Sequence, residues 1–191
     1  MNKGENVLSD RIIPFTYRPV TNKKNGMPLL FALAGISVAL VVLSIQLERF
    51  AGIVSTTAII ALTAAVMFYL RYVGSDYVYN VTVSGDGIAY FVVGKVVGKK
   101  ITTMLAIRVS SIQSIQLFTK SGENKYVPDK TKKRHNFNPS FNPEEFAVMR
   151  TAGRDGTCEI VLECSPEARE RLLQYSVYAR EDERAENEEY E

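Results

Sequence analysis

The sequence predicts a membrane-spanning helical hairpin followed by an α+β domain, in which antiparallel strands form a sheet or barrel closed by one C-terminal helix. Three observations predict this fold class. Residues 27–47 and 51–70 are two apolar runs without a charged side chain. From Asp76 onward, short segments that alternate apolar and polar residues are separated by turns that contain glycine. A serine, a proline and a glutamate at positions 165–167 then begin a segment with a helical apolar stripe.

The two apolar runs have the length of membrane spans. At about 1.5 Å of rise per residue, roughly twenty helical residues span about 30 Å, the thickness of the hydrocarbon core of a bilayer. Only Glu48, Arg49 and Phe50 lie between the runs, which predicts a tight reversal and an antiparallel hairpin over residues 27–73. Neither run contains Asp, Glu, Lys, Arg or His, so a transporter built from this hairpin alone is not expected.

Charges beside the hairpin predict its orientation. Four basic residues lie within about 20 residues before the first run, whereas Arg49 is the single basic residue in the turn. We therefore expect a multi-pass protein of the cell membrane with both termini in the cytoplasm. Residues 1–26 then form a cytoplasmic N-terminal segment. Its apolar and aromatic part, residues 12–20, either lies at the level of the lipid headgroups, pairs with the soluble domain or forms a disordered leader.

Small residues recur at a spacing of four in both apolar runs. They are Gly35 and Ala39 in the first run, and Thr57, Ala61 and Ala65 in the second. Such residues let two membrane helices approach closely, and a threonine hydroxyl can form a hydrogen bond across the contact. We interpret them as residues of helix–helix packing. The alternative is that alanine is simply common in membrane helices.

The chain after the hairpin has the length of one soluble domain. About 120 residues follow Arg71, and we assign residues 74–180 to this domain. The predicted strands cover residues 76–83, 88–93, 101–109, 112–118, 145–151 and 157–164. Residues 84–87 and 94–100 form turns, and residues 119–145 form mostly a long loop.

The last predicted element is a helix that packs against the sheet. Ser165 is its N-cap, Pro166 its first residue, and it ends near Arg180. Its apolar stripe contains Ala168, Leu172, Leu173 and Val177, with Tyr175 or Tyr178 beside them. Residues 181–191 lack an apolar face, so we interpret them as a frayed extension or an acidic tail.

The two cysteines are predicted to be core residues. Cys158 and Cys164 are six residues apart in one predicted strand, which separates them by about 20 Å, whereas a disulfide needs Cα atoms within about 7 Å. They cannot pair with each other. Even spacing places them on the same strand face as Ile160 and Leu162, and no oxidising compartment is implied.

Three short patterns, in this order after the hairpin, resemble a known family. They are Tyr-Asn-Val-Thr at residues 79–82, Gly-Ile-Ala-Tyr at 87–90 and Ile-Arg-Val-Ser-Ser-Ile-Gln-Ser-Ile at 107–115. The chain resembles bacterial membrane proteins that carry a pleckstrin-homology-like (PH-like) domain. The resemblance implies a PH-like β-sandwich or barrel of about seven strands, with the C-terminal helix at one open end. Eukaryotic relatives bind phosphoinositides through basic residues near the first strand turn, but residues 84–87 contain none.

Patterns of catalytic or metal-binding residues are not found in the sequence. Residues 94–100 resemble a phosphate-binding loop, but three residues instead of four separate the glycines, and no serine or threonine follows the lysine. His135 is the sole histidine, and neither cysteine has the spacing of a metal ligand. We expect no catalytic residue, no metal and no cofactor.

The predicted function is therefore non-catalytic: a membrane protein that presents an interaction or scaffolding domain at the cytoplasmic face. Its expected partners are the lipid bilayer and a protein or a second copy. The alternatives are a subunit of an envelope or transport complex and an enzyme whose residues are not recognised. Nucleic acid is not an expected partner, because the net charge is only +2 and the C-terminus is acidic.

Two lysine-rich segments are the candidate contacts with lipid or with an acidic partner. They contain Lys130, Lys132, Lys133 and Arg134 in the long loop, and Lys95, Lys99 and Lys100 in the preceding turn. Basic side chains near an anionic leaflet could each contribute about 1 kcal/mol to binding. The alternative is a solvated loop whose lysines only keep it soluble.

Overall fold

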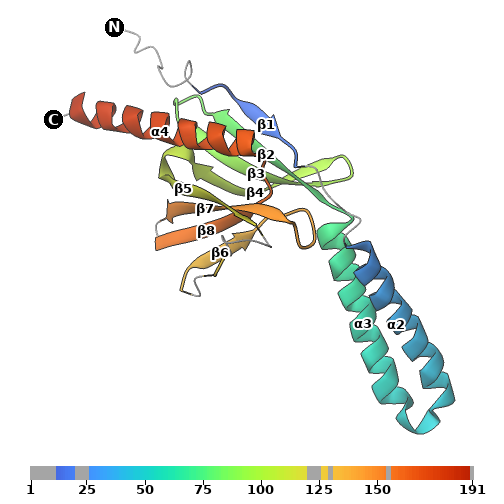
Figure 1. The fold of residues 1–191 in the computed structure, drawn as a ribbon. Coiled ribbons are helices and arrows are strands. Elements are labelled where there is room, and N and C mark those ends of the chain that lie inside the picture. The colour runs from blue at the N-terminus through green and yellow to red at the C-terminus, as the bar shows by residue number, and fades with distance from the viewer. Residues whose placement is uncertain (1–11, 20–25, 120–125, 129–130, 154–155, 190–191) are drawn as a thin grey trace. The chain divides into compact units, whose positions relative to one another are not determined.

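The computed structural model describes residues 12–19, 26–119, 126–128, 131–153 and 156–189 (Figure 1). The chain divides into two compact units. The hairpin unit comprises Thr21–Asp76 and Pro139–Asn142. The sheet unit comprises Met1–Val20, Tyr77–Asn138 and Pro143–Glu191.

The hairpin unit contains two long helices, α2 (Met27–Gln46) and α3 (Ala51–Tyr72), which lie side by side in Figure 1. The short 3₁₀ helix η2 (Glu48–Phe50) joins them. These bounds agree with the apolar runs to within two residues, because the absence of charge over a bilayer-length segment is a strong signal. Both helices are long and apolar enough to cross a membrane.

Three aromatic rings pack together in the hairpin unit. The ring of Phe141 lies 5.0 Å from that of Phe68 and 5.4 Å from that of Tyr72, both near the end of α3. Gly26, which precedes α2, faces the same cluster, since a Cβ atom there would lie 3.3 Å from the Phe68 ring. Aromatic clusters of this kind stabilise contacts beyond the area that they bury.

One sheet of the sheet unit has the order β1-β2-β3-β4. Its strands are β1 (Phe15–Tyr17), β2 (Asp76–Val83), β3 (Ala89–Val97) and β4 (Lys100–Arg108). β1 precedes the hairpin in the chain, yet it pairs antiparallel with β2, with Tyr17 opposite Tyr79. Of the three alternatives for residues 12–20, pairing with the soluble domain is therefore the one observed, and Ile12 is fully buried.

The second sheet has the order β5-β7-β8-β6. Its strands are β5 (Ile112–Thr119), β6 (Lys133–Asn136), β7 (Glu145–Gly153) and β8 (Gly156–Leu162), and η3 (Val109–Ser111) leads into β5. β6 pairs parallel with β8, from Lys133 opposite Cys158 to Asn136 opposite Val161. The prediction that residues 119–145 are mostly a long loop did not include this strand. Because β6 is short and polar, it shows neither alternation nor β-propensity.

The last element is α4 (Pro166–Glu189), whose N-terminus is capped as predicted. The backbone N–H of Ala168 donates to Oγ of Ser165 over 3.2 Å. Leu172, Tyr175 and Ala179 are buried in one hydrophobic core with residues of both sheets. Val177, predicted to be part of the stripe, is 44% exposed, because the buried face turns toward Tyr175 and Ser176 instead. The helix continues past residue 180 to Glu189.

An α+β layout with a C-terminal helix is thus confirmed. The described strands form two four-stranded sheets and do not close into a barrel. The turn between β3 and β4 is also tighter than predicted, since β3 runs on to Val97 and only residues 98–99 connect it to β4. Gly98 has φ +60° there, a conformation that glycine adopts without steric cost.

Candidate functional site

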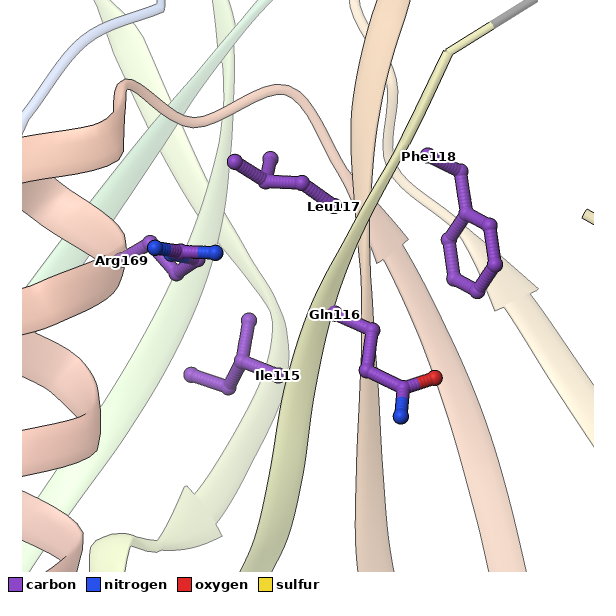
Figure 2. A pocket seen from close by; sticks show the side chains of 5 residues that line it. All are labelled: Ile115, Gln116, Leu117, Phe118 and Arg169. Carbon is purple, nitrogen blue, oxygen red and sulfur yellow. The ribbon is translucent and has the colours of Figure 1, made fainter. Parts of the chain in front are cut away.

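An open pocket lies beside β5 (Figure 2). Its volume is about 440 Å³, and its lining residues are Ile115, Gln116, Leu117, Phe118 and Arg169. Figure 2 shows Ile115 and Leu117 on the side of α4, and Gln116 and Phe118 on the opposite side of the strand. Successive strand residues point to opposite faces of a sheet. A pocket lined by four consecutive residues therefore lies along the edge of β5 and not over one face.

Arg169 brings a positive charge to this pocket from α4. Its Nε atom is buried and has no hydrogen-bond partner among the described residues. Its Nη2 atom lies 3.8 Å from Oε1 of Glu170, whose side chain is 72% exposed. That separation is too long for a hydrogen bond, and exposed ion pairs stabilise little. The guanidinium group therefore retains donors for another acceptor.

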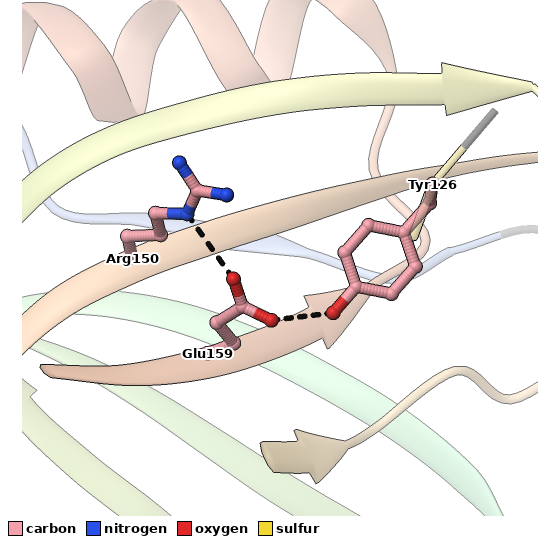
Figure 3. Close-up of polar contacts among 3 residues, drawn as sticks. All are labelled: Tyr126, Arg150 and Glu159. Atoms are coloured by element: carbon pink, nitrogen blue, oxygen red, sulfur yellow. Dashed lines mark hydrogen bonds and ion pairs between the residues drawn. The ribbon is translucent and has the colours of Figure 1, made fainter. Parts of the chain in front are cut away.

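A second polar cluster surrounds Glu159 on β8 (Figure 3). Glu159 is 1% exposed. Nε of Arg150 donates to its Oε1 atom over 3.1 Å, and the hydroxyl of Tyr126 donates to its Oε2 atom. A buried carboxylate is costly unless it is paired and hydrogen-bonded. Both carboxylate oxygens of Glu159 have a donor.

Strand register explains why these charges meet. Arg150 lies opposite Ser114 on β5 and opposite Glu159 on β8, and Glu159 in turn lies opposite Arg134 on β6. The four residues form one row across the sheet. Their neighbours Met149 and Ile160 belong to the hydrophobic core, so alternation places the row on the outer face of the sheet.

The ring of Tyr126 covers part of this outer face. Its centroid lies 5.1 Å from that of Phe118 and 5.9 Å from that of Phe146. Cζ of Arg134 lies 4.8 Å from the same ring, a distance typical of a cation–π contact. Val148 and Val161 are register partners. They lie between the Phe118–Phe146 pair and the row that contains Arg150 and Glu159. Their side chains are only 2% and 0% exposed. The central part of the outer face of this sheet is therefore shielded from solvent.

The protonation of Tyr126 follows from these contacts. Burial, and then the hydrogen bond to Glu159, raises the pKa of Tyr126 to about 12, although the positive charge of Arg134 opposes this rise. The phenol therefore stays protonated near neutral pH and acts as a donor to the carboxylate. The contacts of Glu159 with Arg150 and Tyr126 therefore connect β7, β8 and the segment at residue 126.

The described basic residues that were predicted as contacts belong to two different sheets. Lys99 and Lys100 are exposed at the β3–β4 turn, and Lys95 is half-buried within β3 instead of in a turn. Lys132 and Lys133 are at the start of β6, in the other sheet. The guanidinium group of Arg134 lies over Tyr126, and Lys130 is outside the described residues. Contact of these residues with lipid or a partner stays a prediction.

The small residues of the hairpin divide between buried and exposed positions. Ala65 is 4% exposed and Ala61 is half-buried. Gly35, Ala39 and Thr57 are exposed. Oγ1 of Thr57 donates to the carbonyl oxygen of Ile53 in its own helix, over 3.0 Å, not across the helix contact. Ser37 and Ala58 are the further buried residues of the two helices.

Both cysteines are free and partly buried against the core. Burial raises the pKa of Cys164 to about 11, so that its thiol is protonated and poorly nucleophilic near neutral pH. The described residues contain no group of three or more His, Cys, Asp or Glu side chains that could hold a metal ion.

Comparison of the chain with models of protein families, with curated proteins and with solved structures finds no match. Any role for the pocket or for the Glu159 cluster must therefore be argued from the geometry of this chain. Sequence reasoning did not single out Arg169, Tyr126, Arg150 or Glu159. The sequence did contain a signal for Arg150 and Glu159. These residues of opposite charge are each three residues from a glycine that bounds the same turn, Gly153 or Gly156.

Proposed function

We propose that this chain is a non-catalytic membrane protein whose hairpin spans a bilayer and whose sheet unit is a PH-like interaction domain at the cytoplasmic face. There it binds a protein partner or a second copy. The observation that carries the proposal is the pairing of β1 with β2 across the inserted hairpin, in a chain whose hairpin has membrane-like helices.

The exposure of the hairpin supports membrane insertion. Only 6% of the first span and 11% of the second is buried within the chain. Large apolar side chains such as Phe31, Ile53 and Met67 are 66–70% exposed. In water an apolar surface of this extent is unfavourable by about 25 cal/mol per Å², and monomeric soluble proteins rarely present it. A bilayer, or other membrane helices, removes that cost.

The β1–β2 pairing supports a hairpin with both ends on one side of the membrane. Tyr17 precedes α2 and Tyr79 follows α3, yet they are register partners in one sheet and their rings stack at 6.1 Å. A sheet cannot form across a bilayer, so the chain must leave and return on the same side. The excess of basic residues before α2 favours the cytoplasm as that side.

This topology predicts a labelling pattern in intact cells. A cysteine at Phe50, between the two spans, should react with a membrane-impermeant thiol reagent, because η2 would lie outside. A cysteine at Asn22 should not react until the membrane is permeabilised. Both cysteine variants are made in a chain in which Cys158 and Cys164 are replaced by serine. That chain without an added cysteine gives the background labelling. Labelling at Asn22 but not at Phe50 would overturn the proposed orientation.

The PH-like assignment of the sheet unit rests on its layout. Two four-stranded sheets, in which the β6–β8 pair is parallel, share one core, and α4 packs against η3 and β5 after the last strand. These features accompany the three sequence patterns that resemble the bacterial PH-like family.

A second candidate, a subunit of an envelope or transport complex, is favoured by one observation on α2. Gly35 and Ala39 are exposed, and a Cβ atom at Gly35 would meet no atom of the described residues within 4 Å. This small-residue face does not serve the contact with α3. It is free to approach another membrane helix.

Cross-linking in cells followed by purification of the full chain in mild detergent tests the interaction function. We expect a stoichiometric protein partner or a second copy, bound through the sheet unit. Gly35→Leu should leave such a partner bound, whereas it should release a membrane subunit that packs on α2. Val41→Leu, at a position 52% exposed on another face of the same helix, is the matched control. Recovery of the chain alone and monomeric would contradict both functions.

A further inference from the structure

β4 is the exposed edge strand of the first sheet. It pairs only with β3 among the described strands, and none of its nine residues is buried. The N–H and C=O groups on the free side of such a strand can pair with a further strand. The other edge strands are better protected, because β1 and β6 have only three and four residues and β5 has α4 packed beside it.

The sequence of β4 does not protect its edge. Proteins discourage pairing between edge strands with charged residues or prolines inside those strands. In β4 the two charges are at the ends, Lys100 and Arg108, and residues 101–107 contain neither a charge nor a proline. A neutral strand of this length at an open edge indicates that another strand covers it.

Exposed apolar side chains gather along this strand and the turn before it. Val97, Ile101 and Met104 are 51%, 54% and 49% exposed. Elsewhere in the described part of the sheet unit, large exposed apolar side chains lie singly, at Ile13, Val127 and Val177. A lipid surface would cover apolar side chains, but it does not offer donors and acceptors in the order that a strand edge needs. An extended strand provides both.

The faces of β4 follow from its contacts with the core. Leu105 and Ile107 pack against the hydrophobic core, so Ala106 between them faces outward. The pairing with β3 skips Met104, which is an extra residue in β4. Alternation therefore resumes on the other side of Met104 with Thr103 facing outward.

The position of Ile101 supports this assignment of faces. A Cβ atom at Gly94 would lie 3.0 Å from Cγ2 of Ile101 and 2.9 Å from Cγ1 of Val78. Val78 comes between Tyr77 and Tyr79, which belong to the core, so Val78 faces outward. Ile101 shares that outer face.

We propose that β4 pairs antiparallel with β4 of a second copy of this chain, about a two-fold axis. Residues that lie opposite each other in such a pair project from the same face of the joined sheet. The register that pairs residues 101–108 with one another meets this condition. It places Thr103 opposite Ala106, both facing outward, and Thr102 opposite Ile107, both on the core side. This inference rests on the proposed interaction function and names its partner and surface.

Charge selects this register among its neighbours. In it Lys100 falls outside the paired residues, and no two like charges lie opposite each other. A shift by one residue would place Lys100 opposite Arg108, where like charges are destabilising. The same shift would set the outward Thr103 against the core-facing Leu105. A shift by two residues would restore the faces but would place Lys99 opposite Arg108. The neutral strand therefore fits a second copy in one register.

Cross-linking between two tagged copies of the full chain tests this pair. In a background with Cys158→Ser and Cys164→Ser, one copy carries Thr103→Cys and the other Ala106→Cys, both at exposed positions. Mild oxidation of membranes that contain both copies should join them by a disulfide. Either variant expressed alone should not cross-link, because identical positions would lie three residues out of register, about 10 Å apart, whereas a disulfide needs about 7 Å or less.

Charges introduced at Met104 test the pair without cysteines. In the proposed register the two copies of Met104 are diagonal neighbours at the two-fold axis, so Met104→Lys should weaken dimerisation by about tenfold or more. Co-expression of Met104→Lys with Met104→Asp should restore a dimer of these two chains, which a misfolded variant could not do. Thr82→Lys, at an exposed position of β2, is the matched control and should dimerise like the parent. Native mass spectrometry in mild detergent measures each dimer.

Hydrogen exchange separates a second copy from lipid as the group that covers β4. Amides of residues 101–108 should exchange more slowly in nanodiscs that hold two copies than in nanodiscs that hold one. Equal exchange in the two preparations would overturn the proposal. So would a mixed cysteine pair that cross-links no better than either variant alone, or a failure of Met104→Asp to pair with Met104→Lys.

The failure of this proposal can be told apart from failure of the interaction function. If the parent chain has no second copy but a different protein is recovered in stoichiometric amount, the β4 pair is wrong and the interaction function stands. If neither a second copy nor another protein is recovered, both fail.

Discussion

Replacing Leu172 with alanine is expected to lower the free energy of unfolding of the sheet unit by about 2–5 kcal/mol. Leu172 is 2% exposed and belongs to the core that α4 shares with both sheets. The loss combines the apolar surface that is no longer buried with the cavity that the missing methyl groups leave. At about 2–4 °C per kcal/mol, the midpoint of thermal unfolding should fall by at least about 4 °C.

The measurement follows thiol exposure, because circular dichroism would be dominated by the hairpin. Cys158 and Cys164 are both in the sheet unit and partly buried against its core. A thiol-reactive fluorophore therefore reports the unfolding of this unit in the full chain. Val177→Ala, on the exposed face of the same helix, should shift the midpoint by less than about 1 °C. Equal midpoints for Leu172→Ala and the parent chain would show that α4 does not contribute to the core.

The sequence predicted the elements whose signals are local. Both hairpin helices follow from charge-free runs of bilayer length, and the start of α4 follows from the Ser165 cap. The strands β2, β5, β7 and β8 follow from alternation and from turns that contain glycine. In these segments local propensity and the final fold agree, which is why each could be predicted from a short stretch.

The elements that were missed depend on contacts distant in the chain. β6 is a polar strand that forms only because β8 offers it a parallel edge, and no local pattern marks such a partner. Arg169 looks like a solvent-facing helix residue until β5 is placed beside it. The pairing of Arg150 with Glu159 is different. Gly153 lies opposite Gly156, and three residues farther along each strand Arg150 lies opposite Glu159. The position of the hairpin turn was therefore sufficient to predict this pair.

The second large effect is expected for Glu159→Ala. Removing one partner from a buried ion pair typically costs 3–5 kcal/mol, because the remaining group loses its acceptor. We expect about 3 kcal/mol, the lower end of that range, because the side chain of Arg150 is 37% exposed and can be solvated by water. The hydroxyl of Tyr126 also loses its acceptor, which should loosen the cover over Val148 and Val161. Thiol exposure during thermal or guanidinium unfolding measures the change.

Three comparisons separate the role of the charge from that of packing. Glu159→Gln keeps the shape and one acceptor oxygen, so its loss should be smaller than that of Glu159→Ala. The double variant Glu159→Leu with Arg150→Met should recover most of the stability, because apolar residues of similar volume can replace a buried ion pair without loss. Glu170→Ala, whose side chain is 72% exposed, is the control and should have little effect. If Glu159→Ala unfolds at the same denaturant concentration as this control, the buried cluster does not stabilise the sheet, and the cover formed by Tyr126 needs another explanation.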